Sequence, residues 1–147
     1  MKNPLVSTLI AAGLLLLAQA HASPATPSPI LPDSLSWSSP PAVPGLHAAW
    51  VIGSEDGTAA YVLRVRLEPG AEIPPHSHPD QRITTVLSGS IRVAFGRAVD
   101  AGNMVSVPAG AVYVAPAGTV HYIKAGAHGA VYQESGTGPT GTVIEQH

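Results

Sequence analysis

Two stretches decide the fold of this chain: GAEIPPHSHPDQRITTVLSG at residues 70–89 and GAVYVAPAGTVH at residues 110–121. His76 and His78 are two positions apart, so on an extended strand their imidazoles point to the same side. The prolines beside them fix φ and hold this segment extended. His121 follows a Pro-x-Gly turn, which places it to come from a facing strand. Three converging imidazoles suit a divalent transition metal, so the sequence predicts a metal site.

The remaining pattern is that of short β-strands joined by tight turns. Residues 61–67 alternate, which puts every second side chain from Tyr61 to Leu67 on one apolar face. Further strands are predicted at residues 83–87, 91–95, 105–107, 111–115, 120–124, 130–134 and 142–145. The 15 glycines and 15 prolines disfavour long helices. We therefore predict an all-β fold, either a sandwich or a small barrel.

The N-terminus has the organisation of an exported protein. A basic start precedes an apolar run at residues 5–18 and the small-x-small sequence Ala-His-Ala at residues 20–22. This arrangement is typical of a secretory signal peptide, and the run is short for a membrane span. We expect a periplasmic or secreted protein with a signal peptide at 1–22, a Pro/Ser-rich extended arm or linker at 23–44, and one folded domain at 45–147.

Composition narrows the range of partners. The chain of 147 residues has no cysteine, so it offers no thiolate for nucleophilic chemistry or metal binding. Its charged residues are sparse and its formal net charge is −2. Nothing in this balance favours nucleic acid or an anionic membrane surface. We expect neither as a partner, and no membrane attachment once the signal peptide is cleaved.

The two stretches together resemble the paired signature motifs of the cupin family. The spacing matches at the following positions: Gly70, His76, His78, Gly89, Gly110, Pro116, Gly118 and His121. The likeness covers about residues 45 to 140 and is nearest to small, single-domain bacterial cupins, many of them exported. It implies a cupin-type double-stranded β-helix, or jelly-roll barrel, with the site at one mouth of the barrel. Related folds are often dimers, so we expect a homodimer.

One position departs from the family pattern in a way that bears on metal binding. Where the first motif has a glutamate, this chain has Arg82. A guanidinium about 5 Å from a dication, at an effective dielectric of about 20, is repelled by roughly 6–7 kcal/mol. Arg82 can pair with a carboxylate such as Asp80, or Gln81 can face inward as a fourth ligand. An anion can also lie between Arg82 and the metal, or no metal binds at all.

These alternatives lead to different functions. In the first, His76, His78 and His121 hold Fe, Mn, Ni, Cu or Zn, and the protein acts on a small anionic organic molecule that Arg82 orients, in a dioxygenase- or isomerase-like reaction. In the second, the barrel is a metal-free, non-catalytic binding module in which Arg82 anchors an anionic ligand. In the third, the protein is a metal carrier without a pocket for an organic ligand.

Overall fold

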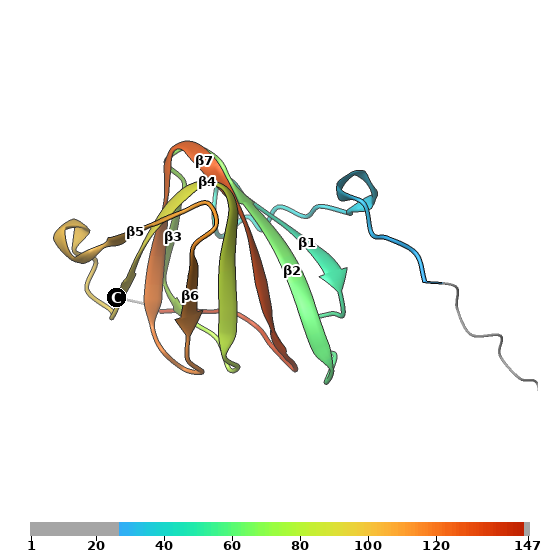
Figure 1. The fold of residues 1–147 in the computed structure, drawn as a ribbon. Coiled ribbons are helices and arrows are strands. Elements are labelled where there is room, and N and C mark those ends of the chain that lie inside the picture. The colour runs from blue at the N-terminus through green and yellow to red at the C-terminus, as the bar shows by residue number, and fades with distance from the viewer. Residues whose placement is uncertain (1–26, 146–147) are drawn as a thin grey trace, which may run out of the picture.

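The computed structural model describes residues 27–145, which form one curled antiparallel sheet and two short 3-10 turns (Figure 1). The strands are β1 (Leu46–Ile52), β2 (Ala60–Leu67), β3 (Glu72–Ser77), β4 (Arg82–Phe95), β5 (Val105–Pro108), β6 (Val112–Ala115), β7 (His121–Thr137) and β8 (Val143–Ile144). The turns are η1 (Pro32–Ser34) and η2 (Ala101–Asn103). The prediction of an all-β fold is confirmed.

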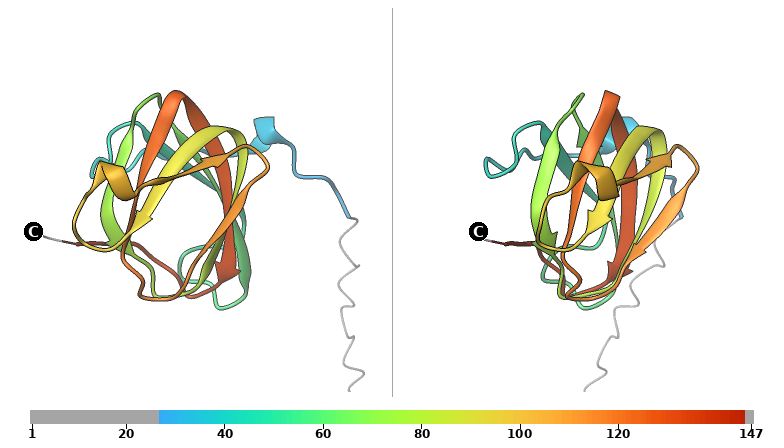
Figure 2. Two further views of the ribbon diagram at one scale, coloured as in Figure 1. Left: turned by 60° about the vertical axis from the view of Figure 1, so that its left-hand side comes forward. Right: turned by 90° about the vertical axis from the view of Figure 1, so that its left-hand side faces the viewer.

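The sheet closes on itself around its two longest strands. β7 pairs with β2 through its C-terminal half, with β3 through its N-terminal half, and with β4 along most of its length. β4 also pairs with β5 and β6, while β1 extends the sheet beyond β2. The result is an open-ended barrel, seen nearly along its axis in the left-hand view of Figure 2. The predicted jelly-roll barrel is therefore confirmed.

Strands β4 and β7 are each longer than the sequence suggested. We predicted a break at Ser88–Gly89, but β4 continues through it with register shifts on either side of Gly89. Gly89 has φ +68°, and a Cβ there would lie 2.1 Å from the carbonyl oxygen of Gly129 on β7. Gly129 likewise has φ +72°. The two glycines let the paired strands bend together, so a sequence signal that resembled a turn is a β-bulge.

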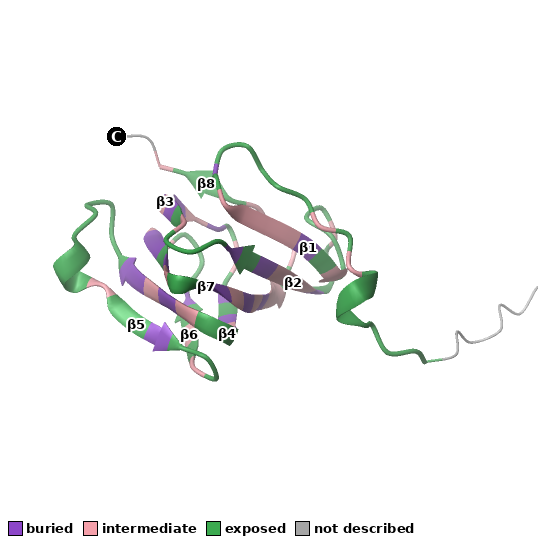
Figure 3. Cartoon of the chain, turned by 90° about the horizontal axis from the view of Figure 1, so that it is seen from above, coloured by how far each residue is buried: buried purple, intermediate pink, exposed green. Residues whose placement is uncertain are grey.

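The barrel interior is filled by the apolar side chains that alternate inward along the strands. Figure 3 shows this as buried segments alternating with more exposed ones along β4 and β7. The buried core consists of Val43, Val65, Leu67, Ile73, Val86, Ile91, Val93, Val107, Ile123, Ala125, Ala130 and Tyr132. Their burial is the main source of stability in a chain that has no disulfide.

The described part of the arm lies against the barrel from Trp37 onward. The Arg66 guanidinium stacks 4.5 Å from the centre of the Trp37 ring, Ser38 forms an isolated bridge with Ala48, and Val43 is buried in the core. Residues 27–31, which precede η1, extend away from the barrel (Figure 1). The predicted signal peptide at 1–22 lies outside the described residues. Within the described range, no helix is both long and apolar enough to span a membrane.

Candidate metal centre

Strands β3 and β7 bring three histidines together inside the barrel. His76 is on β3 and pairs in register with His121 at the start of β7, while His78 follows β3 immediately. One ring nitrogen from each residue lies within 4.8 Å of the others. The three residues are only 1–4% exposed. We call this group the histidine cluster.

The backbone fixes the tautomer of every ring in the histidine cluster. The Nδ1 atoms of His76, His78 and His121 lie 2.8, 2.7 and 3.1 Å from the carbonyl oxygens of Pro74, Gly141 and Thr119, respectively. A carbonyl can only accept a hydrogen bond, so each Nδ1 carries a proton and donates it. In a neutral imidazole the other nitrogen, Nε2, then keeps its lone pair. Nε2 of His78 is buried and has no hydrogen-bond partner.

Burial keeps these rings neutral. It lowers the pKa of His76 to about 3, with a further contribution from the neighbouring His121. It also lowers the pKa of His78 to about 4, and the positive charge of Arg82 acts in the same direction. The pKa of His121 is lowered by burial as well. The cluster therefore presents lone pairs rather than protons at neutral pH.

The histidine cluster fits a transition metal by its donor chemistry. Neutral imidazole is a good ligand for zinc, copper, iron and nickel. Ligating histidines usually donate their second nitrogen to a carbonyl or carboxylate, which is the arrangement seen at all three Nδ1 atoms. The partnerless Nε2 of His78 is a buried acceptor that a metal would satisfy.

Arg82 points into the barrel, where the protein supplies its partners. Its Nη1 donates to Glu134 Oε2 at 2.6 Å, and its Nη2 donates to Thr140 Oγ1 at 2.8 Å and to the Gly141 carbonyl at 3.0 Å. Nε lies 3.8 Å from Asp80 Oδ1. Burial alone would lower the pKa of Arg82, but the charge and hydrogen bond of Glu134, together with Tyr61 and Asp80, outweigh burial and the pKa is raised. Arg82 is thus a charged, paired group and not a free cation.

The segment that follows β7 connects Arg82 to the histidine cluster. The Gly141 carbonyl accepts from both Arg82 Nη2 and His78 Nδ1. The Thr140 hydroxyl accepts from Arg82 and donates to Asp80, which also accepts from the Tyr61 hydroxyl at 2.6 Å. Arg82 and His78 therefore share one hydrogen-bond acceptor.

The predicted fourth ligand lies elsewhere. Gln81 is exposed, because alternation along β4 places Arg82 on the inner face and its neighbour on the outer one. The residue that sequence reasoning missed is Glu134, whose register partner across the sheet is Thr84 and not Arg82. The sequence did contain a signal for this residue, because Glu134 lies on the inward-facing side of the apolar strand predicted at residues 130–134. A charged residue at such a position needs a partner.

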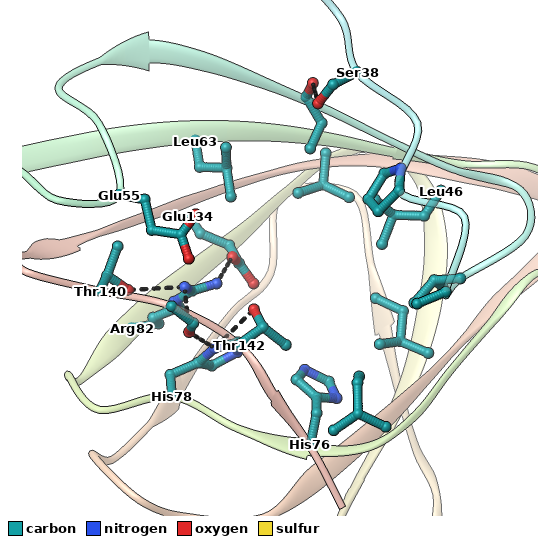
Figure 4. A pocket seen from close by; sticks show the side chains of 18 of the residues that line it. Ser38, Leu46, Glu55, Leu63, His76, His78, Arg82, Glu134, Thr140 and Thr142 are labelled. Atoms are coloured by element: carbon teal, nitrogen blue, oxygen red, sulfur yellow. Dashed lines mark hydrogen bonds and ion pairs between the residues drawn. The ribbon is translucent and has the colours of Figure 1, made fainter.

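A cavity of about 360 Å³ opens beside His76 and His78 of the histidine cluster (Figure 4). His76, His78, Arg82, Glu134 and Thr140 line one end. The other end is lined by apolar side chains from the arm, β1 and β2. The volume is near the lower end of the range, about 300–1,000 Å³, that is typical of small-molecule sites.

Known proteins share this architecture. Residues 63–131 match the family model described as cupin domain. None of the curated proteins is significantly similar to the chain in sequence. Together, the barrel and the histidine cluster define a double-stranded β-helix with a candidate metal site in its interior. The matched residues contain both motifs, so this region is similar to a cupin domain, as the two motifs indicated.

Solved structures support the assignment of the fold. KdgF from Halomonas sp. is 22% identical, covers 75% of this chain and 94% of its own, and has a TM-score of 0.61. The polyketide cyclase RemF from Streptomyces resistomycificus is 18% identical over 83% of this chain and 89% of its own, with a TM-score of 0.65. Oxalate decarboxylase from Bacillus subtilis is 23% identical over 71% of this chain and 28% of its own, with a TM-score of 0.56. At these identities the likeness is one of fold.

Proposed function

We propose that the histidine cluster holds one divalent transition metal and that the cavity beside it takes a small anionic organic molecule. The observation that carries this proposal is the set of three Nδ1–H···O=C hydrogen bonds, which leave three Nε2 lone pairs available inside the barrel. Such preorganisation removes the need to reorient the rings when a metal binds. Fe, Mn, Ni, Cu and Zn all remain candidates.

Charge balance supports metal binding despite Arg82. The repulsion expected from an unpaired guanidinium is reduced because Glu134 lies 2.6 Å from it and neutralises it locally. Arg82 stands where the first motif has a glutamate, and Glu134 on β7 supplies a carboxylate that pairs with Arg82. With the Arg82–Glu134 pair neutral, the bound metal is the positive group at this end of the cavity, so an ionic ligand that binds the metal there is an anion.

The reaction class we favour is dioxygenase- or isomerase-like chemistry. A bound metal would supply Lewis acidity or an open coordination position. The residues of this chain would hold and orient the ligand, with Arg82 and Thr140 at its charged end and the barrel walls excluding water. Two structures of similar fold are by name enzymes, an oxalate decarboxylase and a polyketide cyclase. An anion that contacts Arg82 directly would compete with Glu134 for its donors.

Metal analysis of protein purified without a chelating tag tests this proposal. About one metal ion per chain is expected, with loss of most of it in the variant His76→Ala. A matched control is His128→Ala, because His128 is exposed and lies outside the histidine cluster. Less than about 0.1 ion per chain, unchanged by reconstitution, would refute metal binding. A metal-free protein that still binds a carboxylate and loses it in Arg82→Ala would support the non-catalytic alternative.

We further propose that the protein is exported and forms a homodimer. The basic start, apolar run and Ala-His-Ala sequence favour export. The outer face of β4 and β6 carries exposed apolar side chains, with Ile83 and Val114 opposite one another in register. Among the described strands, β6 pairs only with β4, so its other edge is open to a second copy. N-terminal sequencing of the mature protein tests cleavage after Ala22.

A further inference from the structure

We infer that the ligand of this cavity is an amphipathic monocarboxylic acid, with its carboxylate toward the histidine cluster and a hydrocarbon body under the N-terminal arm. The inference rests on the proposed function and narrows its substrate class. It excludes short dicarboxylates and sugars as preferred ligands. The observation behind it is that the two ends of the cavity differ sharply in chemistry.

The polar end of the cavity is compact. In Figure 4, His78, Arg82, Glu134 and Thr140 gather on one side with His76 nearby. Hydrogen bonds join Arg82 to Glu134 and Thr140. These groups are fixed before a ligand arrives, so they provide a site for one charged head group.

The opposite end offers hydrocarbon. It is lined by Val43, Leu46, Val65, Ile73 and Tyr132, whereas Leu63 lies beside Glu134, its register partner on β7 (Figure 4). Leu46 is half-buried and packs against the core, which leaves part of its surface free to contact a ligand. Ser38, a polar residue at this end, donates its hydroxyl to the Ala48 carbonyl. A second carboxylate placed here would lose its hydration without gaining a charged partner.

The arm completes the apolar end. Val43 is only 7% exposed and belongs to the hydrophobic core, while Pro40 and Ala42 also line the cavity. The arm is held by the Ser38–Ala48 bridge and by Trp37 under Arg66. The sequence at 38–43 therefore contributes to ligand specificity as well as to the fold.

Glu55 strengthens the discrimination between ligands. Its side chain lines the cavity near the polar end, and Figure 4 shows it on the same side as Glu134. A ligand with one carboxylate can place it toward the metal and Arg82. A short dicarboxylate must bring its second charge near these two glutamates or against hydrocarbon, and both placements are unfavourable.

A chain-length series tests the inference. Butanoate, hexanoate and octanoate are titrated by calorimetry into the full mature chain loaded with zinc, and hexanedioate serves as the matched dicarboxylate. Each added methylene that is buried should tighten binding about fourfold until the apolar end is filled. Hexanedioate should bind at least about tenfold more weakly than hexanoate. A flat series, or hexanedioate binding as tightly as hexanoate, would overturn the inference.

Two variants separate the apolar wall from general stability. Leu46→Ser should reduce the gain per methylene, whereas Val62→Ser should leave it unchanged. Val62 is the neighbour of Leu63 on β2 and does not line the cavity. Thermal unfolding of each variant verifies that it is folded. An unchanged chain-length gain in the folded Leu46→Ser variant would contradict the assigned wall.

Measuring the metal content of the same samples distinguishes a failure of the proposed metal site from a failure of the proposed amphipathic ligand. The apolar wall does not depend on the metal, so the chain-length trend is measured on the protein whatever its zinc content. Absence of metal with a clear trend refutes only the metal site. One zinc per chain with no trend refutes only the amphipathic ligand.

Discussion

The buried pair of Arg82 and Glu134 yields the sharpest prediction for this protein. Replacing either partner should destabilise the fold, but the two replacements should change metal affinity in opposite directions. Glu134→Gln leaves Arg82 beside His78, with which it shares the Gly141 carbonyl, and with only the more distant Asp80 carboxylate to compensate its charge. Arg82→Met instead leaves a buried negative charge in the same cavity.

The structure sets the size of the stability effect. Both side chains are about 5% exposed, and removing one partner of such a buried pair typically costs about 3–5 kcal/mol. Glu134→Gln should fall at the low end, about 3 kcal/mol, because Arg82 keeps Thr140, Gly141 and the nearby Asp80. Arg82→Met should fall nearer about 4 kcal/mol, since it also removes the donors to Thr140 and Gly141.

The effect on metal affinity follows from charge alone. A unit charge within about 10 Å of a dication, at an effective dielectric of about 20, changes its binding by more than about 1.4 kcal/mol, or tenfold. Glu134→Gln should therefore weaken zinc binding at least about tenfold, and Arg82→Met should strengthen it by a similar factor. The double variant should return near the original affinity and recover most of the lost stability.

Two measurements check these values. Urea unfolding of the metal-free proteins gives the stability changes, and competition with a chromogenic chelator gives zinc affinity. If both single variants shift zinc affinity in the same direction, the charges of this pair do not act on the histidine cluster. If the stability losses simply add in the double variant, the two side chains are not coupled, and the reasoning from the buried pair fails.

Three further predictions concern pH, the bulge in β4 and assembly. The metal-free protein should lose stability as the pH falls below 6.5, by about 1.4 kcal/mol per pH unit for each of His76 and His78. The reason is that burial lowers the pKa of these rings to about 3 and about 4, so they stay neutral in the folded protein but protonate in the unfolded chain. Urea unfolding between pH 7 and 5 measures this slope, which the variant His76→Gln should reduce. Gly89→Ala should lower the free energy of unfolding by at least about 3 kcal/mol more than Gly70→Ala does. Both glycines have φ near +70°, but only at Gly89 would the added Cβ lie 2.1 Å from a carbonyl oxygen, that of Gly129. Equal losses of stability in thermal or urea unfolding would contradict this prediction. Val114→Asp should convert the proposed homodimer to a monomer in analytical ultracentrifugation without weakening zinc binding, and an unchanged mass would exclude this face as the interface.

The sequence predicted the histidine cluster because the direction of each ring is set locally, although His121 comes from another strand. The spacing of His76 and His78 and the turn before His121 decide where the rings point once strands form. The tautomer of His78 could not be predicted from the sequence, because the hydrogen-bond partner of its Nδ1 is the Gly141 carbonyl, 63 residues away. The conformation of the segment after β7 depends on the closed barrel, so no local pattern reveals that contact.

The strand boundaries show a second limit of structure prediction from the sequence. Ser88–Gly89 and residues 125–129 have the composition of turns, and local propensity predicts a break at each. In the barrel, the two sites lie opposite one another, with Gly89 paired to Ala130. Pairing between the strands maintains the ladder through both bends, so tertiary contacts override the local preference.

Arg82 shows why a motif position cannot be interpreted without its neighbours in space. Judged by the family pattern alone, an arginine in place of a glutamate argues against a metal. In the folded chain, Glu134 compensates that charge from 52 residues away, and both side chains lie on the inner wall of the cavity. The local charge of the pair is therefore zero, where a lone motif glutamate would contribute a negative charge. A metal held by three neutral imidazoles beside a neutral pair keeps more of its positive charge, and such a site should favour anionic ligands more strongly than one with a ligating carboxylate.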